Sequence, residues 1–531
     1  MNKKVCSFPI LFALLALLIG TCAVVFPASA QAAPTSTGSI TVSGTVASSY
    51  DAYQIFSANV VDGDSDAKIA TDLAWASDAV RDAALPVLHS AGMPNSQTTA
   101  QEAAEWLNTD SHLTSALSAQ LARSLQSSGA EPVALNAGTT AELSCGYWLI
   151  VADDDAIAQG ETGTAPIMAL VGGSAVTVKP KAATPKVAKY VLEDSTAAWQ
   201  KAADATVADD LYWRLSATVP AGLTAYDTYT VRFVDTMSAG LDPSKVAASV
   251  RVYAAAGADG GFDVVQTGKD GRAGTEPAKG WTDITAQCAT KVAADGKTFT
   301  VRTGDLIAAL GGADAFTAGA RVVAVYNAPL NGACNHGIAK GNPNEVYLRY
   351  PRSPFADQSG DAGFTRTPSD DACAYTWDLA LTKRGSDGDK PLARAVLSIA
   401  DDRGRTLAAD GTWDAEGKAT VTTGEDGRVT VSGVDSGKLE VRELKAPKGY
   451  TAFEGTRSVT VKAEGLDVDQ VAAAKPKLTI TAESPLRADS ADGSTGSLEA
   501  SLINTPTGTP PSITTGGFMP STGDMAMYAA A

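Results

Sequence analysis

Short segments in which apolar and polar residues alternate recur at regular spacing near the C-terminal end of this 531-residue sequence. Such alternation, bounded by turn-forming residues, is typical of β-strands with one buried face. The segments are 377–385, 392–401, 417–423, 427–434, 438–444 and 458–465. Because short strands at this spacing bury their apolar faces best as two packed sheets, we expect a β-sandwich over residues 375–505.

The rest of the chain is too long to share that one hydrophobic core. Residues 184–370 contain a second set of short strand-like segments and are expected to form a middle β-sandwich. Residues 35–181 are expected to form an α+β domain, in which a helical insertion over 67–128 interrupts the strands. Within the insertion, Thr98 and Thr99 with Gln101 and Glu102 resemble a capping box. A further helix is indicated by leucines that recur every four residues, at Leu113, Leu117, Leu121 and Leu125.

The two ends of the sequence indicate export and a stalk. Lys3 and Lys4 precede an apolar run from Val5 to Phe26, and Ala28-Ser29-Ala30 offers a cleavage site, so residues 1–30 are expected to be a signal peptide. A lipidated Cys22 and an uncleaved anchor are the alternatives. Residues 506–531 begin with a tract rich in Pro, Thr and Gly that cannot bury a core and is expected to form a stalk.

Composition disfavours several functional classes. The formal net charge of −17 lacks the basic footprint that nucleic acids and anionic membranes require. The three histidines are far apart in sequence, so we expect no metal site, no cofactor and no histidine-based catalytic triad. Four cysteines follow the signal, at Cys145, Cys288, Cys334 and Cys373. Export permits disulfides, but the sequence does not choose a pairing.

The expected C-terminal sandwich resembles a collagen-adhesin B-type (CnaB) domain. The resemblance rests on the segment LEVRELKAPKGY from Leu439 to Tyr450, preceded by TTGEDGRVTVSG. It implies that a lysine on the first strand is joined covalently to an asparagine on the last, with a glutamate between them. The matching residues are Lys383, Asn504 and Glu443. The implied fold is mostly β, with tandem Ig-like sandwich domains.

Physical chemistry explains why these three residue types are needed. Burial favours the neutral form of Lys383 and leaves a lone pair on Nζ, so the amine becomes a nucleophile. Glu443 is expected to polarise the Asn504 carbonyl and to carry protons to the departing ammonia. Proximity inside the folded core then replaces a cofactor, and the reaction occurs once per molecule. The competing interpretation is three solvated residues without chemistry.

The middle domain resembles the isopeptide-forming middle domain of sortase-assembled Gram-positive pilins. TPKVAKYV places Lys189 on its first strand, and FVDTMSAGL places Asp235 as the catalytic acid. The last strand departs from the family pattern, since the acceptor asparagine is replaced near Arg352 and Ser353. The alternative acceptors are Asn327, Asn342 and Asn344, and a disulfide among Cys288, Cys334 and Cys373 is a further way to cross-link this domain.

Two further motifs resemble the assembly signals of these pilins. The sequence Met519-Pro520-Ser521-Thr522-Gly523 resembles the Leu-Pro-x-Thr-Gly sorting signal, which implies that a sortase cleaves after Thr522 and holds it as an acyl donor. The segment VTVKPK resembles the Val-x-Val-x-Pro-Lys pilin motif, which implies Lys181 as the acceptor nucleophile, with Lys179 as the reserve. Only DMAMYAAA follows the sorting motif, so we expect either a truncated record or a released subunit.

The resemblance therefore implies a secreted structural subunit of a cell-wall pilus, not a turnover enzyme. Its expected partners are a pilin-specific sortase, other copies of itself, and host matrix or glycans. An ancillary pilin or wall-anchored adhesin is the alternative function. A carbohydrate-active enzyme is a third interpretation, but no motif marks the pair of catalytic carboxylates that it would need.

Overall fold

The computed structural model describes residues 36–508 except 65–66, 110–111, 181–183, 222, 258–264, 267–272, 277–279 and 317–318. Strands are the main regular structure of the described residues and greatly exceed helices, which confirms the expected mostly β fold class. They form two compact units. The first contains the described residues up to Trp199, with Asp210–Pro329 and Pro343–Ala372. The second contains Gln200–Asp209, Leu330–Asn342 and the described residues from Cys373 onward. The domain limits given above stay a prediction.

The N-terminal part of the first unit has two sheets and three helices. One sheet has the order β3-β2-β6-β7 with β4 paired to β2, and the other has the order β5-β1-β8. The elements are β1 (Thr37–Val42), β2 (Ser49–Asp62), β3 (Lys68–Trp75), α1 (Asp78–Ser90), α2 (Ala100–Asn108), α3 (Ser115–Ser127), β4 (Val133–Asn136), β5 (Thr140–Ser144), β6 (Gly146–Ala152), η1 (Asp154–Ala156), β7 (Ile167–Val171) and β8 (Val176–Val178).

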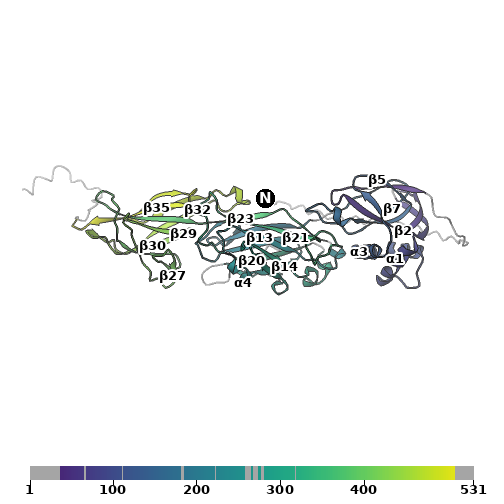
Figure 1. Cartoon of the computed structure of the whole chain (residues 1–531), viewed down its shortest axis with the longest axis horizontal. Coiled ribbons are helices and arrows are strands. Elements are labelled where there is room, and N and C mark those ends of the chain that lie inside the picture. Colours follow the sequence, from purple (N-terminus) through teal and green to yellow (C-terminus); the bar gives the residue numbers. More distant parts are fainter. Residues whose placement is uncertain are drawn as a thin grey trace, which may run out of the picture. The chain divides into compact units, whose positions relative to one another are not determined.

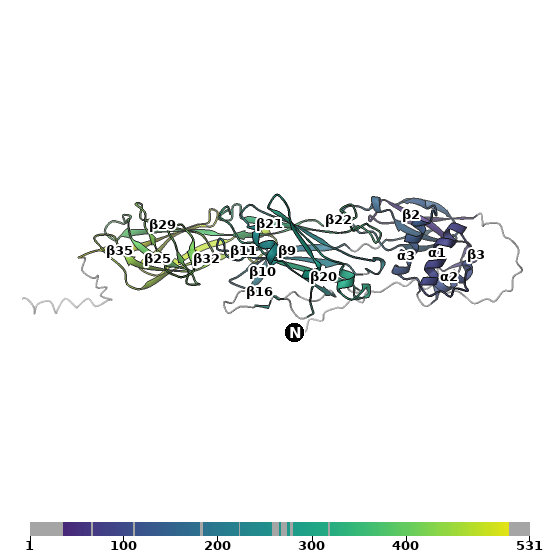
Figure 2. The same ribbon diagram turned by 60° about the horizontal axis from the view of Figure 1, so that its bottom comes forward.

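Strands β2 and β6 form the centre of this part because both of their faces are covered. On one face, Ile55 and Leu149 pack with the buried residues of the helices. On the other face, Tyr50 and Ile150 pack with Ile40 of the smaller sheet. Helices α1 and α3 accordingly gather on one side of β2 (Figures 1 and 2).

The helix signals in the sequence are partly confirmed. Thr99 is the N-cap of α2, and its hydroxyl accepts from the Glu102 backbone N–H while the Glu102 carboxylate accepts from the Thr99 N–H, which completes the capping box. Leu117, Leu121 and Leu125 are buried on α3. Leu113 precedes the N-cap of α3 and is exposed, so its place on the predicted helical face was wrong.

The predicted helical insertion over 67–128 begins with a strand. Residues Lys68–Trp75 form β3, which pairs antiparallel with β2 from Asp62↔Lys68 to Phe56↔Trp75. Strand β3 lies at the edge of its sheet, and its residues are half-buried or exposed. An edge strand with no fully buried face does not need strict alternation, which explains why the sequence pattern missed it.

The remainder of the first unit is a β-sandwich. One sheet has the order β10-β9-β12-β20-β14-β17, and facing strands run in the order β21-β13-β19-β18 with β22 paired to β21. The strands are β9 (Lys186–Glu193), β10 (Ala198–Gln200), β12 (Tyr212–Val219), β13 (Arg232–Met237), β14 (Arg251–Ala256), β15 (Val265–Gln266), β16 (Ala273–Glu276), β17 (Thr282–Asp283), β18 (Ala289–Val292), β19 (Thr298–Arg302), β20 (Ala320–Asn327), β21 (Asn342–Pro351), β22 (Phe364–Arg366) and β23 (Asp370–Tyr375). The helical turns are η2 (Leu223–Ala225), η3 (Pro243–Lys245), α4 (Val246–Ser249), η4 (Thr285–Gln287), α5 (Leu306–Ala309) and η5 (Ala313–Phe316).

The second unit contains a second β-sandwich. One sheet has the order β29-β24-β35-β31 with β34 paired to β35, and the other has the order β27-β26-β25-β30-β32-β33 with β28 paired to β25. The elements are β11 (Ala202–Asp204), β24 (Trp377–Gly385), β25 (Val396–Ala400), β26 (Thr406–Leu407), β27 (Trp413–Asp414), β28 (Val421–Thr422), β29 (Arg428–Val434), β30 (Gly437–Lys445), β31 (Tyr450–Thr451), β32 (Thr456–Glu464), η6 (Val471–Ala473), β33 (Lys477–Ala482), β34 (Leu486–Asp492) and β35 (Ser497–Pro506).

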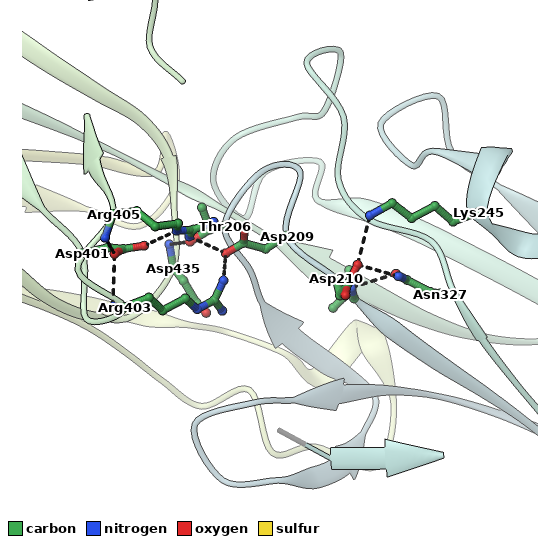
Figure 3. Close-up of polar contacts among 10 residues, drawn as sticks. Thr206, Asp209, Asp210, Lys245, Asn327, Asp401, Arg403, Arg405 and Asp435 are labelled. Atoms are coloured by element: carbon green, nitrogen blue, oxygen red, sulfur yellow. Dashed lines mark hydrogen bonds and ion pairs between the residues drawn. The ribbon is translucent and has the colours of Figure 1, made fainter. Parts of the chain in front are cut away.

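The segment Gln200–Asp209 belongs to the second unit although it lies far away in sequence. The Asp209 carboxylate binds Arg405 through two hydrogen bonds, of 2.6 and 2.9 Å, and also pairs with Arg403 (Figure 3). Asp401 accepts from Arg405 Nε at 2.7 Å and fixes the guanidinium. Bidentate pairs of this kind are strong and directional, so they hold the segment against its sandwich.

Among the described residues, no disulfide involves Cys145, Cys288, Cys334 or Cys373, which corrects the suggested disulfide among the last three. Their sulfur atoms have other partners. Cys288 Sγ donates to the Ile284 carbonyl at 3.2 Å, and Cys334 Sγ lies 3.6 Å from His336 Nε2. Within the ranges that the structure describes, no helix is long and apolar enough to span a membrane.

Candidate functional site

The inward face of the C-terminal sandwich carries three polar residues among apolar ones. Lys383 continues the buried face of β24 after Leu379 and Leu381, since alternate residues of a strand point to the same side. By the same period, Asn504 shares the inward face of β35 and Glu443 that of β30. Strands β24 and β35 are parallel neighbours, whereas β30 belongs to the opposite sheet.

The three side chains contact one another in this core. Lys383 Nζ donates a hydrogen bond to Asn504 Oδ1 and lies 3.3 Å from Glu443 Oε1. Asn504 Nδ2 donates to the same Glu443 oxygen at 3.0 Å. The side chains of Lys383 and Glu443 are both fully shielded from solvent. The structure therefore brings together the three residues that the sequence analysis singled out in this domain.

Burial alters the chemistry of the lysine. Removal from water lowers the pKa of Lys383 to about 8, and the nearby Glu443 charge opposes this effect without cancelling it. The neutral amine is therefore accessible near physiological pH, which is the form that can attack a carbonyl carbon. The Phe453 backbone N–H donates to the second Glu443 oxygen at 3.2 Å, and this contact orients the carboxyl group between its two partners.

A second buried cluster lies in the sandwich of the first unit. Lys189 on β9 pairs with Asp235 on β13, and both side chains are completely buried. Lys189 Nζ also donates to the Tyr326 hydroxyl at 2.9 Å, and Tyr326 donates to Asp235 Oδ2 at 3.0 Å. Asn344 Nδ2 donates to the same hydroxyl at 2.8 Å. Burial raises the pKa of Asp235, although the lysine opposes this shift.

This cluster identifies which asparagine shares the core with Lys189. Among the three alternatives, Asn344 lies in the cluster. Asn327 instead donates to Asp210 at 2.7 Å, and Asp210 also binds Lys245 (Figure 3). Asn342 donates to the backbone carbonyls of Asn335 and Ala374.

The expected position of the acceptor near Arg352 and Ser353 stays a prediction, and the contacts of these two residues lie elsewhere. Arg352 donates to the Asp154 carbonyl at 3.2 Å, and Ser353 accepts from the Phe355 backbone. Neither has a hydrogen bond or ion pair with Lys189 among the described residues. Asn344 lies on β21, which ends at Pro351, just before this segment.

Sequence reasoning missed Tyr326 and could have found Asn344. Asn344 has the same parity as Val346, Leu348 and Tyr350, all buried on β21, so alternation alone marks it as an inward polar residue. Tyr326 follows a run of residues on β20 that are nearly all buried, where alternation carries no information about facing.

The expected assembly signals lie outside the described residues. They are the signal peptide over 1–30, the acceptor Lys181, and the sorting motif Met519-Pro520-Ser521-Thr522-Gly523 with its acyl donor Thr522. The reserve nucleophile Lys179 is described and is exposed.

The C-terminal sandwich and its buried site define a class of domain, since residues 378–475 match the family model of the SpaA prealbumin-like fold domain. Lys383 and Glu443 lie inside this match, and Asn504 follows it. The chain is also similar to the trypsin-resistant surface T6 protein of Streptococcus pyogenes serotype M6, with 29% identity over 143 residues. That match covers 25% of this chain and about a quarter, 24%, of the relative's length.

Two solved structures are similar over most of the chain. The T6 backbone pilin of serotype M6 Streptococcus pyogenes has 17% identity and a TM-score of 0.46, covering 89% of this chain and 98% of that one. The full-length major pilin SpaD of Corynebacterium diphtheriae has 15% identity and a TM-score of 0.43, covering 90% and 100%. The family model and the T6 protein confirm the resemblance to Gram-positive pilin subunits.

Proposed function

We propose that this chain is a structural subunit of a covalently polymerised surface pilus, stiffened by intramolecular bonds between lysine and asparagine side chains. The observation that supports this proposal most directly is the buried contact of Lys383 with Asn504 beside Glu443. A charged lysine and a charged glutamate are costly to bury in a β-sandwich. The amide that forms when the lysine reacts with the asparagine carries no charge at the former amine.

The proposed reaction is balanced without any cofactor. The neutral Lys383 Nζ attacks Cγ of Asn504, a new N–C bond forms, and the bond from Cγ to Nδ2 breaks. Glu443 takes a proton from the attacking nitrogen and delivers one to Nδ2, which leaves as ammonia. The carboxyl group is regenerated, but the amine is consumed, so each site turns over once and the chain is not an enzyme in the ordinary sense.

The Lys189 cluster supports a second bond of the same kind, with Asn344 as the acceptor and Asp235 as the acid. Lys189 lies on β9 and Asn344 on β21, which belong to the two facing layers of the middle sandwich. This bond would therefore join the layers, whereas the Lys383–Asn504 bond would join adjacent parallel strands of one sheet. Both bonds would resist peeling of strands under tension.

Polymerisation is proposed to follow the pilin pattern in the sequence. A pilin-specific sortase would cleave after Thr522 and transfer the acyl group to Lys181 of another copy of the chain. The product would be a secreted, wall-linked fibre. Host matrix or glycan binding would be a property of the fibre surface and belongs to the alternative of an ancillary adhesin.

Mass spectrometry of the folded, signal-free protein tests the internal bonds. We expect the intact mass to be lower than the sequence mass by two molecules of ammonia. Asn504→Ala and Asn344→Ala should each restore one of the two losses, and tryptic digestion should yield two branched peptides. A wild-type mass with no loss of ammonia would refute the cross-linked subunit.

A further inference from the structure

The Tyr326 hydroxyl is the junction of the middle cluster. It accepts from Lys189 Nζ and from Asn344 Nδ2 and donates to Asp235 Oδ2, at distances of 2.9, 2.8 and 3.0 Å. A phenolic hydroxyl has one donor and two acceptor positions, so all three are used here. Its ring packs edge-on against Phe299 at 4.7 Å, which fixes the direction of the hydroxyl in the core.

The C-terminal cluster has no such junction because its acid reaches the asparagine directly. Glu443 Oε1 accepts from Asn504 Nδ2 at 3.0 Å and lies 3.3 Å from Lys383 Nζ. The acid of the middle cluster is an aspartate, which is shorter by one methylene group. Among the described residues, Asp235 makes no hydrogen bond to Asn344, and the two are linked only through Tyr326.

We propose that Tyr326 is a positioning and proton-relay residue that replaces the missing reach of Asp235 in the second lysine–asparagine bond. This inference rests on the proposed function, in which that bond forms. As Lys189 Nζ attacks Cγ of Asn344, its proton passes to Asp235. The carboxyl proton then moves to the Tyr326 oxygen while the tyrosine proton moves to Nδ2, which leaves as ammonia. Tyr326 and Asp235 end the step with the protons they began with.

Two unpartnered atoms agree with a cluster that is set up for reaction. Asp235 Oδ1 and Asn344 Oδ1 are buried and have no hydrogen-bond partner among the described residues. An unsatisfied buried acceptor costs about 1–3 kcal/mol. If the Tyr326 hydroxyl served only to satisfy neighbouring polar groups, we would not expect Asp235 Oδ1 and Asn344 Oδ1 to lack donors. A proton that arrives on Asp235 during the reaction supplies one such donor.

The experiment compares two bonds within one molecule. The full-length, signal-free chain is produced as wild type, Tyr326→Phe, and Tyr326→Phe combined with Asp235→Glu. At intervals after a pulse of expression, the branched peptides that contain Lys189 and Lys383 are quantified by mass spectrometry. In Tyr326→Phe we expect the Lys189 bond to form about 10²-fold more slowly, as for the loss of general acid–base catalysis. The Lys383 bond is the internal control and should be unchanged.

The double variant separates proton relay from packing. A glutamate at position 235 restores the missing methylene, so it should reach Asn344 directly and recover most of the lost rate. Equal rates in wild type and Tyr326→Phe would overturn the relay, and so would slow formation that Asp235→Glu does not rescue. Absence of the Lys189 branched peptide in wild type is a different result, because it refutes the second bond itself and the relay with it.

Discussion

At the scale of single residues, the inward polar positions are what distinguish these sandwiches from ordinary ones. Lys383, Glu443 and Asn504 each occupy a place where the strand period requires an apolar side chain. The period and the family motif together were sufficient to predict this cluster. The middle cluster was only half predicted, because Tyr326 bridges residues through a hydroxyl whose position depends on the packing of two sheets.

The shifted pKa of Lys383 gives a pH-dependent stability in a chain that cannot form its bond. Burial lowers the pKa of Lys383 to about 8, below its ordinary value of about 10.4 in the unfolded chain, and we expect Asn504→Ala to keep this lowered pKa. Between these values the unfolded state binds more protons, so the free energy of unfolding should rise with pH and fall again as pH drops towards 8. The expected span is at most about 3 kcal/mol.

Urea denaturation at several pH values measures this effect. The matched control is Asn504→Ala with Lys383→Met, which keeps an unbranched side chain shorter by one atom but removes the titrating amine. We expect the difference in the free energy of unfolding between the two variants to change with pH between the folded and unfolded pKa values of Lys383. Parallel stability curves for the two variants would show that Lys383 is not desolvated before the bond forms.

Loss of the C-terminal bond should cost substantial stability. The bond would close a loop between residues 121 positions apart, and tying such a loop in the unfolded chain is worth about 4–5 kcal/mol by the entropy model for cross-links. Asn504→Ala should therefore lower the thermal midpoint of the C-terminal sandwich in calorimetry. Asn342→Ala is the control, since that residue lies in the second unit outside the cluster and should leave the ammonia loss intact.

At the scale of elements, local signals predicted helix starts better than edge strands. The capping box of Thr99 could be predicted because its two residues lie three positions apart in sequence, and the structure contains it. Strand β3 was missed because its partner β2 determines its conformation, and its own side chains bury no continuous face. Pairing between distant segments is not readable from a single stretch of sequence.

Removal of the helix cap gives a local test of the N-terminal part. Thr99→Ala deletes the hydroxyl that accepts from the Glu102 N–H, and we expect it to destabilise this part by about 1 kcal/mol. Chemical denaturation followed by tryptophan fluorescence would report the change through Trp106 on the same helix. Gln101→Ala, at an exposed position of α2, should have a much smaller effect.

At the scale of the whole molecule, the proposed assembly depends on Lys181 and Thr522, which lie outside the described residues. Co-expression with a pilin sortase should convert the wild-type chain into a ladder of polymers that resists boiling in detergent. Lys181→Ala should abolish the ladder because it removes the proposed acceptor amine, whereas Lys179→Ala should retain it. A ladder that survives Lys181→Ala and disappears with Lys179→Ala would transfer the role to the reserve lysine.

The predicted assembly rests on sequence motifs, whereas the predicted domains rest on strand patterns. Strand patterns and turn residues were enough to predict a mostly β chain with several sandwiches, because each sandwich is built from its own short strands. They could not predict that Gln200–Asp209 would pack with the C-terminal sandwich, since that depends on the ion pairs of Asp209 with Arg403 and Arg405.

The parallel pairing of β24 with β35 has a consequence for how the C-terminal sandwich could diversify. Once Lys383 and Asn504 are joined, a pull along the fibre crosses directly from one strand to the other, and the intervening chain lies outside the path of the force. Loops in that bypassed stretch are then free to lengthen or change sequence without weakening the fibre. If the proposed bond forms, sequence variation in these loops would be separated from the strands that bear the load.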